Sequence, residues 1–210
     1  MKKVLSSILV VAFALTSLIT LSNSATAAPC PNPNADGKTI GKILVGKTAV
    51  DVKYVDYPAG GALNPPASPL NAGLSIRHMP LSSPVGSSLI VWHVNYNGCD
   101  GKLNVLTSKK VGFKFSIIDE KGFKQNFKIT NIIQVLKGKY KSEWFELNGA
   151  RQLVFVTCSG TVVNRHYKDN LIVFASPVDA VSTSPTPNPT NSPAGVTPTA
   201  SSTPSPSATK

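Results

Sequence analysis

The chain has 210 residues, a formal net charge of +11 at pH 7 and three cysteines. Once the two terminal segments described below are set aside, this length accommodates one domain with a sizeable core. The positive charge suits an anionic surface such as a cell envelope. We expect no binding of nucleic acid, because the lysines are scattered along the chain, largely at predicted turns.

The first 28 residues have the three parts of a secretory signal peptide. Residues 1–3 (Met-Lys-Lys) are positively charged, residues 4–21 are uncharged and mostly apolar, and residues 24–28 supply small side chains in an Ala-x-Ala pattern. The apolar stretch is also at the lower limit of the length that spans a bilayer, so a membrane anchor through residues 4–21 is an alternative. Both interpretations predict export, to the extracellular face of the cell membrane or to the cell wall.

Composition sets the boundaries of the remaining segments. We interpret residues 29–41 as a linker, residues 42–178 as one folded domain and residues 179–210 as a tail rich in Pro, Ser and Thr. The tail has no aromatic residue and cannot bury enough apolar area to offset the entropy lost on ordering. We therefore predict a disordered tail, either an inert spacer or an O-glycosylated stalk.

The folded segment is predicted to be rich in β-strands, because β-branched and aromatic residues recur over short runs with partial alternation. Predicted strands cover 42–55 (with a bend at Gly46), 87–93, 111–118, 123–136, 152–158 and 171–174. Turns or loops are predicted at 58–70, 95–101 and 119–122, and one helical turn at 142–147. Seven or eight strands at this spacing favour a closed barrel or a sandwich.

The three cysteines are Cys30, Cys99 and Cys158. In an exported protein, cysteines usually pair, and an odd number leaves one thiol over. Cys30 and Cys99 lie in polar segments, whereas Cys158 ends the most hydrophobic predicted strand. A disulfide between Cys30 and Cys99 would leave Cys158 free, and unpaired thiols at both positions are the alternative.

His93 and Cys158 each end a short β-rich run. A cysteine and a histidine brought together by a fold can act as a thiol nucleophile and its proton partner. The histidine would protonate a leaving amine and later deprotonate an incoming one. From residue types alone, a buried core cysteine and a structural histidine are the alternative interpretation.

The residues around these two positions resemble the sortase family of cysteine transpeptidases. Val-Phe-Val-Thr-Cys at 154–158 is similar to the strand that ends in the sortase nucleophile. Ser-Gly at 159–160 and His-Tyr-Lys-Asp-Asn-Leu-Ile-Val-Phe-Ala at 166–175 resemble the Cys-Gly-Gly … Tyr-x-Asp-Asn-x-Val-Val pattern of class F, the actinobacterial type. Upstream, residues 84–95 resemble the Gly-x-x-x-Ile-x-Gly-His-Val-Asp segment of that class, and residues 59–65 the stretch before it.

The resemblance implies an all-β fold, a sortase-like eight-stranded β-barrel with one or two short helices. It implies an enzyme that cleaves a sorting signal, typically similar to Leu-Pro-x-Thr-Gly, in another surface protein. The acyl group would pass through a thioester on Cys158 to an amine of the cell wall or a pilin, with His93 moving the proton. No cofactor is implied, and we expect no metal because His and Cys do not cluster at ligand spacing.

The third sortase residue is an arginine, and its usual position falls near Asn170 in this chain. We predict Arg165 as the cation instead, because its forked donors suit a carbonyl or oxyanion, with Lys168 as the alternative. The family's glycine before the histidine is Trp92 here, and its aspartate is Asn95. These departures leave open a catalytically inactive, sortase-like surface binding module. An L,D-transpeptidase is disfavoured because the His-Gly-Cys-x-Arg type of signature is absent.

Overall fold

The computed structural model describes residues 29–57 and 62–178. The predicted signal or anchor segment (1–28) and the predicted tail (179–210) lie outside the described residues, as do the first three residues of the 59–65 motif. Within the described ranges, no helix has the length and apolar character needed to cross a membrane.

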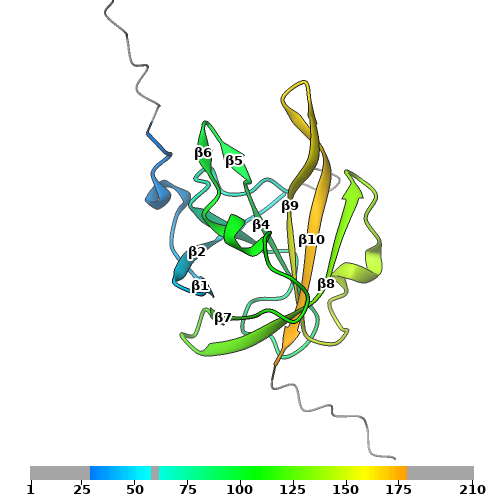
Figure 1. The fold of residues 1–210 in the computed structure, drawn as a ribbon. Helices are drawn as coiled ribbons and strands as arrows, with labels where there is room; N and C mark the ends of the chain where they lie inside the picture. Colours follow the sequence, from blue (N-terminus) through cyan, green and yellow to red (C-terminus); the bar gives the residue numbers. More distant parts are fainter. Residues whose placement is uncertain (1–28, 58–61, 179–210) are drawn as a thin grey trace, which may run out of the picture.

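Eight strands form a closed barrel, which confirms the predicted fold class (Figure 1). Its strands are β1 (Gly41–Val45), β2 (Thr48–Val55), β3 (Asn71–Ser75), β4 (Ser87–Trp92), β7 (Lys114–Ile118), β8 (Lys124–Leu136), β9 (Gln152–Val163) and β10 (His166–Pro177). They are joined in the order β1-β2-β3-β4-β9-β10-β8-β7. The barrel is mixed, because β2–β3 and β4–β9 pair in parallel and the other neighbours are antiparallel.

The remaining described elements are short. Strands β5 (Asn95–Tyr96) and β6 (Cys99–Asp100) form a small hairpin, and the 3-10 helices are η1 (Pro33–Asp36), η2 (Lys102–Leu106) and η3 (Ser142–Phe145). The helical turn expected at 142–147 is therefore present as η3. The predicted linker 29–41 contains η1, and it reaches the barrel at Gly41, where β1 begins.

The structure differs from the sequence prediction most clearly at β3 and at the end of β9. Strand β3 was missed, because its five residues are all buried and include small side chains rather than an alternating pattern. Cys158 was expected to end its strand, yet β9 continues to Val163 and pairs with β10 up to His166. The turn between them consists of Asn164 and Arg165, both with positive φ, as a tight two-residue hairpin turn requires.

Alternation along the strands separates two apolar clusters. The inward-facing side chains fill the barrel, with Trp92, Phe155 and Phe127 among the fully buried ones. Phe155 packs edge-on against Trp92 and Phe115, with ring centroids 6.4 and 5.6 Å away. Burying an aromatic or aliphatic side chain of this size contributes about 1.5–3 kcal/mol, so this interior supplies the rigid frame for residues on the outer face.

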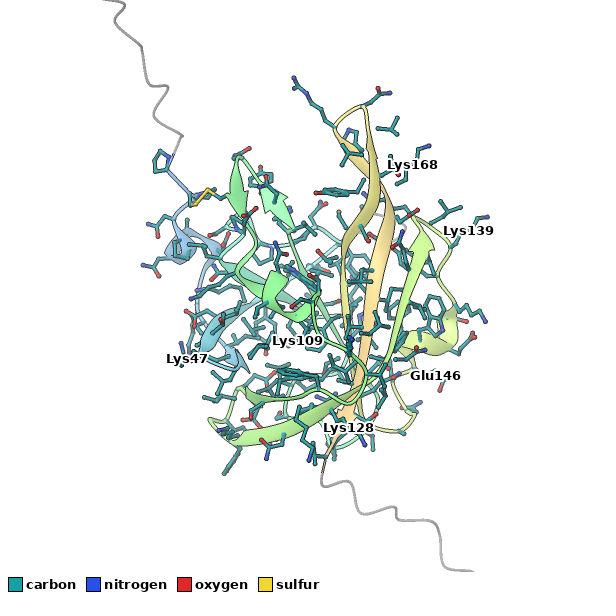
Figure 2. All side chains as sticks on the ribbon, in the orientation of Figure 1. Lys47, Lys109, Lys128, Lys139, Glu146 and Lys168 are labelled. Atoms are coloured by element: carbon teal, nitrogen blue, oxygen red, sulfur yellow. A yellow bond between two sulfur atoms is a disulfide. The ribbon has the colours of Figure 1, made fainter. Side chains whose placement is uncertain are left out.

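The surface charge is distributed around the barrel. Five labelled lysines, Lys47, Lys109, Lys128, Lys139 and Lys168, lie at separate places on the molecule (Figure 2). In the structure they do not form one continuous basic face, which agrees with the scattered charge seen in the sequence.

Candidate active site

The strand register brings His93 and Cys158 next to each other. The last β4–β9 pair is Trp92 with Thr157, and the Thr157 hydroxyl donates a 2.8 Å hydrogen bond to the Trp92 carbonyl. Cys158 is the next residue on β9, and His93 is the first residue after the end of β4. Because side chains alternate along a strand, Cys158 belongs to the outer face, together with Val156.

Asn170 lies on the other side of Cys158, directly opposite it in the antiparallel β9–β10 pair. Cys158 therefore lies between Asn170 on β10 and the end of β4, which His93 follows directly. Cys158 is half-buried and is the free cysteine of the described chain. The family's arginine position, assigned to Asn170 by the sequence, holds a neutral, buried amide.

The His93 side chain is held between two loops. Tyr96 stacks on its ring at a centroid distance of 4.6 Å, and the ring is hydrogen bonded to the Pro66 carbonyl. Burial lowers the pKa of His93 below its ordinary value of 6.5, and the negative charge of Asp36 and the bond to Pro66 oppose this shift. The imidazole is therefore biased toward its neutral form, which can accept a proton.

The backbone around His93 is fixed by η2 and by the residue before it. Asn104 accepts a hydrogen bond from the Trp92 indole nitrogen at 3.1 Å and donates one to the Val94 carbonyl at 2.7 Å. Gly101 also donates to Val94, and a Cβ atom at Gly101 would collide with the His93 carbonyl oxygen. Only glycine permits this close approach. The side chain of Trp92, where the family has glycine, points into the barrel core.

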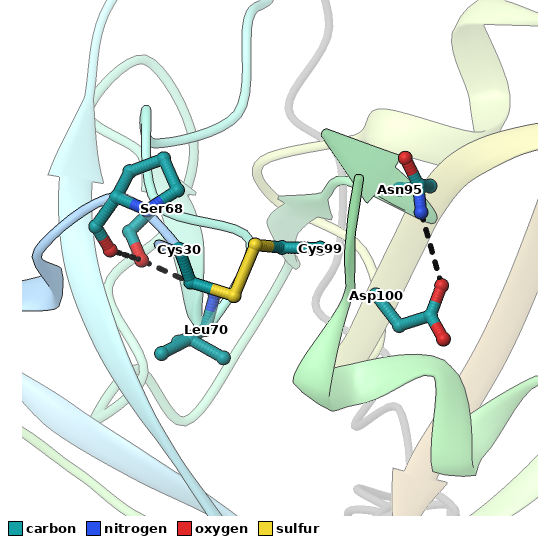
Figure 3. The surroundings of a disulfide bond; sticks show 7 residues. Cys30, Ser68, Leu70, Asn95, Cys99 and Asp100 are labelled. Atoms are coloured by element: carbon teal, nitrogen blue, oxygen red, sulfur yellow. Dashed lines mark hydrogen bonds between the residues drawn. A yellow bond between two sulfur atoms is a disulfide. The ribbon is translucent and has the colours of Figure 1, made fainter. Parts of the chain in front are cut away.

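Cys30 and Cys99 form a disulfide with a Cα–Cα distance of 5.6 Å (Figure 3). Cys99 lies opposite Tyr96 in the β5–β6 hairpin. Asn95, which stands where the family has aspartate, donates a 3.1 Å hydrogen bond to Asp100 in the same hairpin. The disulfide thus joins the segment before the barrel to the hairpin that carries the stacking partner of His93.

Tyr140 is a site residue that the sequence prediction missed. It lies in the loop between β8 and β9, and its hydroxyl accepts a hydrogen bond from the amide nitrogen of Asn170. Burial and the nearby charge of Cys158 raise the pKa of Tyr140 above its ordinary value of 10.0, while the bond from Asn170 lowers it. No local pattern singles out this tyrosine, because only the folded loop brings it to the strand pair.

The structure does not bring Arg165 to Cys158. Because β9 and β10 stay paired up to Val163 and His166, Arg165 lies at the hairpin tip, about 16 Å along the strand from Cys158. The tight turn formed by Asn164 and Arg165 fixes the backbone at this tip. The alternative cation, Lys168, lies at a register shift in β10 and its side chain is exposed (Figure 2).

An apolar strip extends from Cys158 and Asn170 along the outer face. Two rows of the same register make it up: Val91, Val156, Ile172 and Ile133, then Leu89, Val154 and Phe174. Part of the strip is covered by η3, where Trp144 packs edge-on against Phe174 with centroids 5.9 Å apart. The strip itself is mostly buried, so the half-buried Cys158 thiol borders a covered apolar cluster rather than an open apolar surface.

Solved structures with the same fold are sortases. Sortase A from Corynebacterium diphtheriae matches with a TM-score of 0.53 and 18% identity, over 70% of this chain and 64% of that chain. A lid mutant of Streptococcus agalactiae sortase C1 matches with a TM-score of 0.53 and 14% identity, over 69% and 72%. The pilus-related sortase C of Group B Streptococcus gives 0.52 and 19%, over 69% of each chain. No protein-family model and no curated protein sequence matches the chain.

These similarities identify the described domain as having the sortase fold. At 13–19% identity they concern the fold alone, and the resemblance to class F stays a prediction. The chemistry must therefore be argued from the residues of this chain.

Proposed function

We propose that the chain is a sortase-type cysteine transpeptidase that cleaves a sorting signal in other surface proteins. The observation that supports this most directly is the free Cys158 on the outer face of a barrel with the sortase fold, with His93 directly after the end of the neighbouring strand β4. The acyl acceptor would be an amine of the cell wall or a pilin.

In the proposed reaction, His93 takes the proton of the Cys158 thiol, and the resulting thiolate attacks the scissile carbonyl and forms a tetrahedral intermediate. Collapse of this intermediate breaks the C–N bond, and His93 protonates the leaving nitrogen. The resulting thioester is attacked by the incoming amine, which gives its proton to His93. The lowered pKa of His93 favours the neutral imidazole that this second step needs.

The disulfide between Cys30 and Cys99 fits an oxidising compartment. We therefore also propose that the protein acts outside the cell, at the membrane face or in the cell wall, with residues 4–21 as signal or anchor.

The test is incubation of the purified protein with a library of sorting-signal peptides and hydroxylamine as the accepting amine. We expect one peptide class to be cleaved and converted to its hydroxamate by the wild type but not by Cys158→Ala. Absence of both products over the whole library would contradict the proposal.

A catalytically inactive binding module is the second candidate. It is favoured by one observation: the position opposite Cys158 holds Asn170 rather than a cation. Such a module would bind a sorting-signal peptide, measurable by calorimetry, and leave it intact. Peptide binding with equal affinity by the wild type and Cys158→Ala, without cleavage by either, would establish this alternative.

A further inference from the structure

A neutral hydrogen-bonded pair, Tyr140 and Asn170, lies beside the Cys158 thiol. Asn170 is only 6% exposed and directly opposes Cys158 across the β9–β10 pair. Its amide nitrogen Nδ2 donates to the hydroxyl oxygen of Tyr140. A tyrosine hydroxyl that accepts a hydrogen bond still has its own proton to donate. The pair therefore presents one hydrogen-bond donor next to the sulfur.

The surroundings hold this donor in place and keep it protonated. The Tyr140 ring packs edge-on against Phe145 of η3, with centroids 6.1 Å apart and an interplanar angle of 72°. Phe145 in turn contacts Trp144, which packs on the barrel. Burial and the charge of Cys158 both raise the pKa of Tyr140, so the hydroxyl remains neutral when the cysteine is a thiolate.

We propose that Tyr140 is a catalytic residue that donates a hydrogen bond to the oxyanion formed when Cys158 attacks the substrate carbonyl, with Asn170 as its positioning residue. This inference rests on the proposed function. During attack, the C–S bond forms and the π electron pair of the carbonyl moves to oxygen, where the Tyr140 hydroxyl stabilises the charge without transferring its proton. During collapse, the oxygen regains the double bond, the C–N bond breaks, and His93 protonates the nitrogen.

A neutral donor suffices for this role. Removing one positioned donor from an oxyanion site costs about 10²–10³ in kcat. Of the candidate cations, Arg165 lies at the hairpin tip and the Lys168 side chain is exposed to solvent. The strand register places Asn170 opposite Cys158, and the Asn170 side chain is hydrogen bonded to the Tyr140 hydroxyl. Tyr140 is thus the donor that the fold brings to the thiol.

The test compares Tyr140→Phe with the wild type in single-turnover formation of the Cys158 thioester. We expect the maximal rate to fall about 100-fold, with the half-saturating peptide concentration changed less than about threefold because the ring remains. A circular dichroism melt at the wild-type midpoint should report an intact fold. Tyr54→Phe is the matched control, since Tyr54 is similarly exposed, at 50% against 43%, and lies on β2.

Asn170→Ala supplies a second, independent readout. If Asn170 acts by positioning Tyr140, the double variant should lose no more rate than Tyr140→Phe alone, whereas unrelated structural effects would add. A Tyr140→Phe rate within threefold of the wild type overturns the role of Tyr140 and leaves the proposed function standing. A wild type that forms no thioester with any peptide overturns both.

Discussion

His93 and Cys158 perform chemistry only as a pair, because a thiol becomes a good nucleophile as the thiolate and the leaving amine needs a proton. The Thr157–Trp92 hydrogen bond locks β4 to β9 immediately before these two residues. The positions of His93 and Cys158 are therefore set by the residues that precede them, Trp92 and Thr157, whose side chains are buried.

Replacing His93 with alanine should slow peptide cleavage at least about 100-fold, the lower range for a positioned acid–base group. The fold should survive, since the backbone at this point is held by Asn104 and Gly101. Steady-state cleavage and a circular dichroism melt check this outcome. A loss below about threefold would assign the proton transfer to another group.

At the scale of elements, strands with one buried face and one exposed face were predictable from the sequence. Strands whose two faces are both buried or both exposed were not. Strands β7 and β8 show an apolar face and a polar face, which the sequence pattern reports directly. Strand β3 is buried on both faces, so its pattern resembles that of the neighbouring loop. The outer parts of β9 and β10 are exposed on both faces and were likewise missed.

The candidate site was predictable where it lies on strands. His93 and Cys158 follow apolar runs, and the family resemblance joined them. Arg165, the predicted cation, lies in the β9–β10 hairpin turn. The sequence does not reveal this turn, because Asn164-Arg165 lacks the glycine that usually marks it. Tyr140 comes from a loop whose position depends on aromatic packing of η3 on the barrel, and a single sequence does not contain that information.

Arg165→Ala should change turnover less than about twofold, well below the effect of a lost oxyanion donor, because the hairpin tip is remote from the thiol. Lys168→Ala is the matched control and should behave in the same way. Peptide-cleavage rates of both variants provide the measurement. A large loss in Arg165→Ala alone would mean that the hairpin bends over Cys158 when substrate binds.

At the scale of the whole molecule, the disulfide joins residues separated by 69 positions. Closing a loop of this length is expected to stabilise the folded state by about 2–4 kcal/mol, through the restricted unfolded chain. Replacing Cys30 and Cys99 by serine should lower the free energy of unfolding by that amount, measured in a denaturant titration. An unchanged midpoint would show that the disulfide contributes nothing to stability.

Acidification should destabilise the fold below about pH 6.5. Burial lowers the pKa of His78 and His93 below their ordinary value of 6.5, so near pH 6 the unfolded chain binds more protons than the folded one. The contribution of the two neutral histidines to the free energy of unfolding is therefore fully present above pH 6.5. It is lost as the pH falls below 6.5 toward the lowered pKa values of the folded state. His78→Gln should flatten the dependence of the melting temperature on pH between 5 and 7, whereas replacing the exposed His166 should not.

The central claim is that Cys158 carries an acyl group during turnover. The most direct measurement is the intact mass of the wild type mixed with a cleaved peptide and quenched in acid, followed by proteolytic mapping. We predict a mass increase equal to the acyl fragment, located on Cys158, removed by hydroxylamine and absent in Cys158→Ala. Cleavage of the peptide without any adduct on Cys158, or with undiminished rate in Cys158→Ala, would contradict the account.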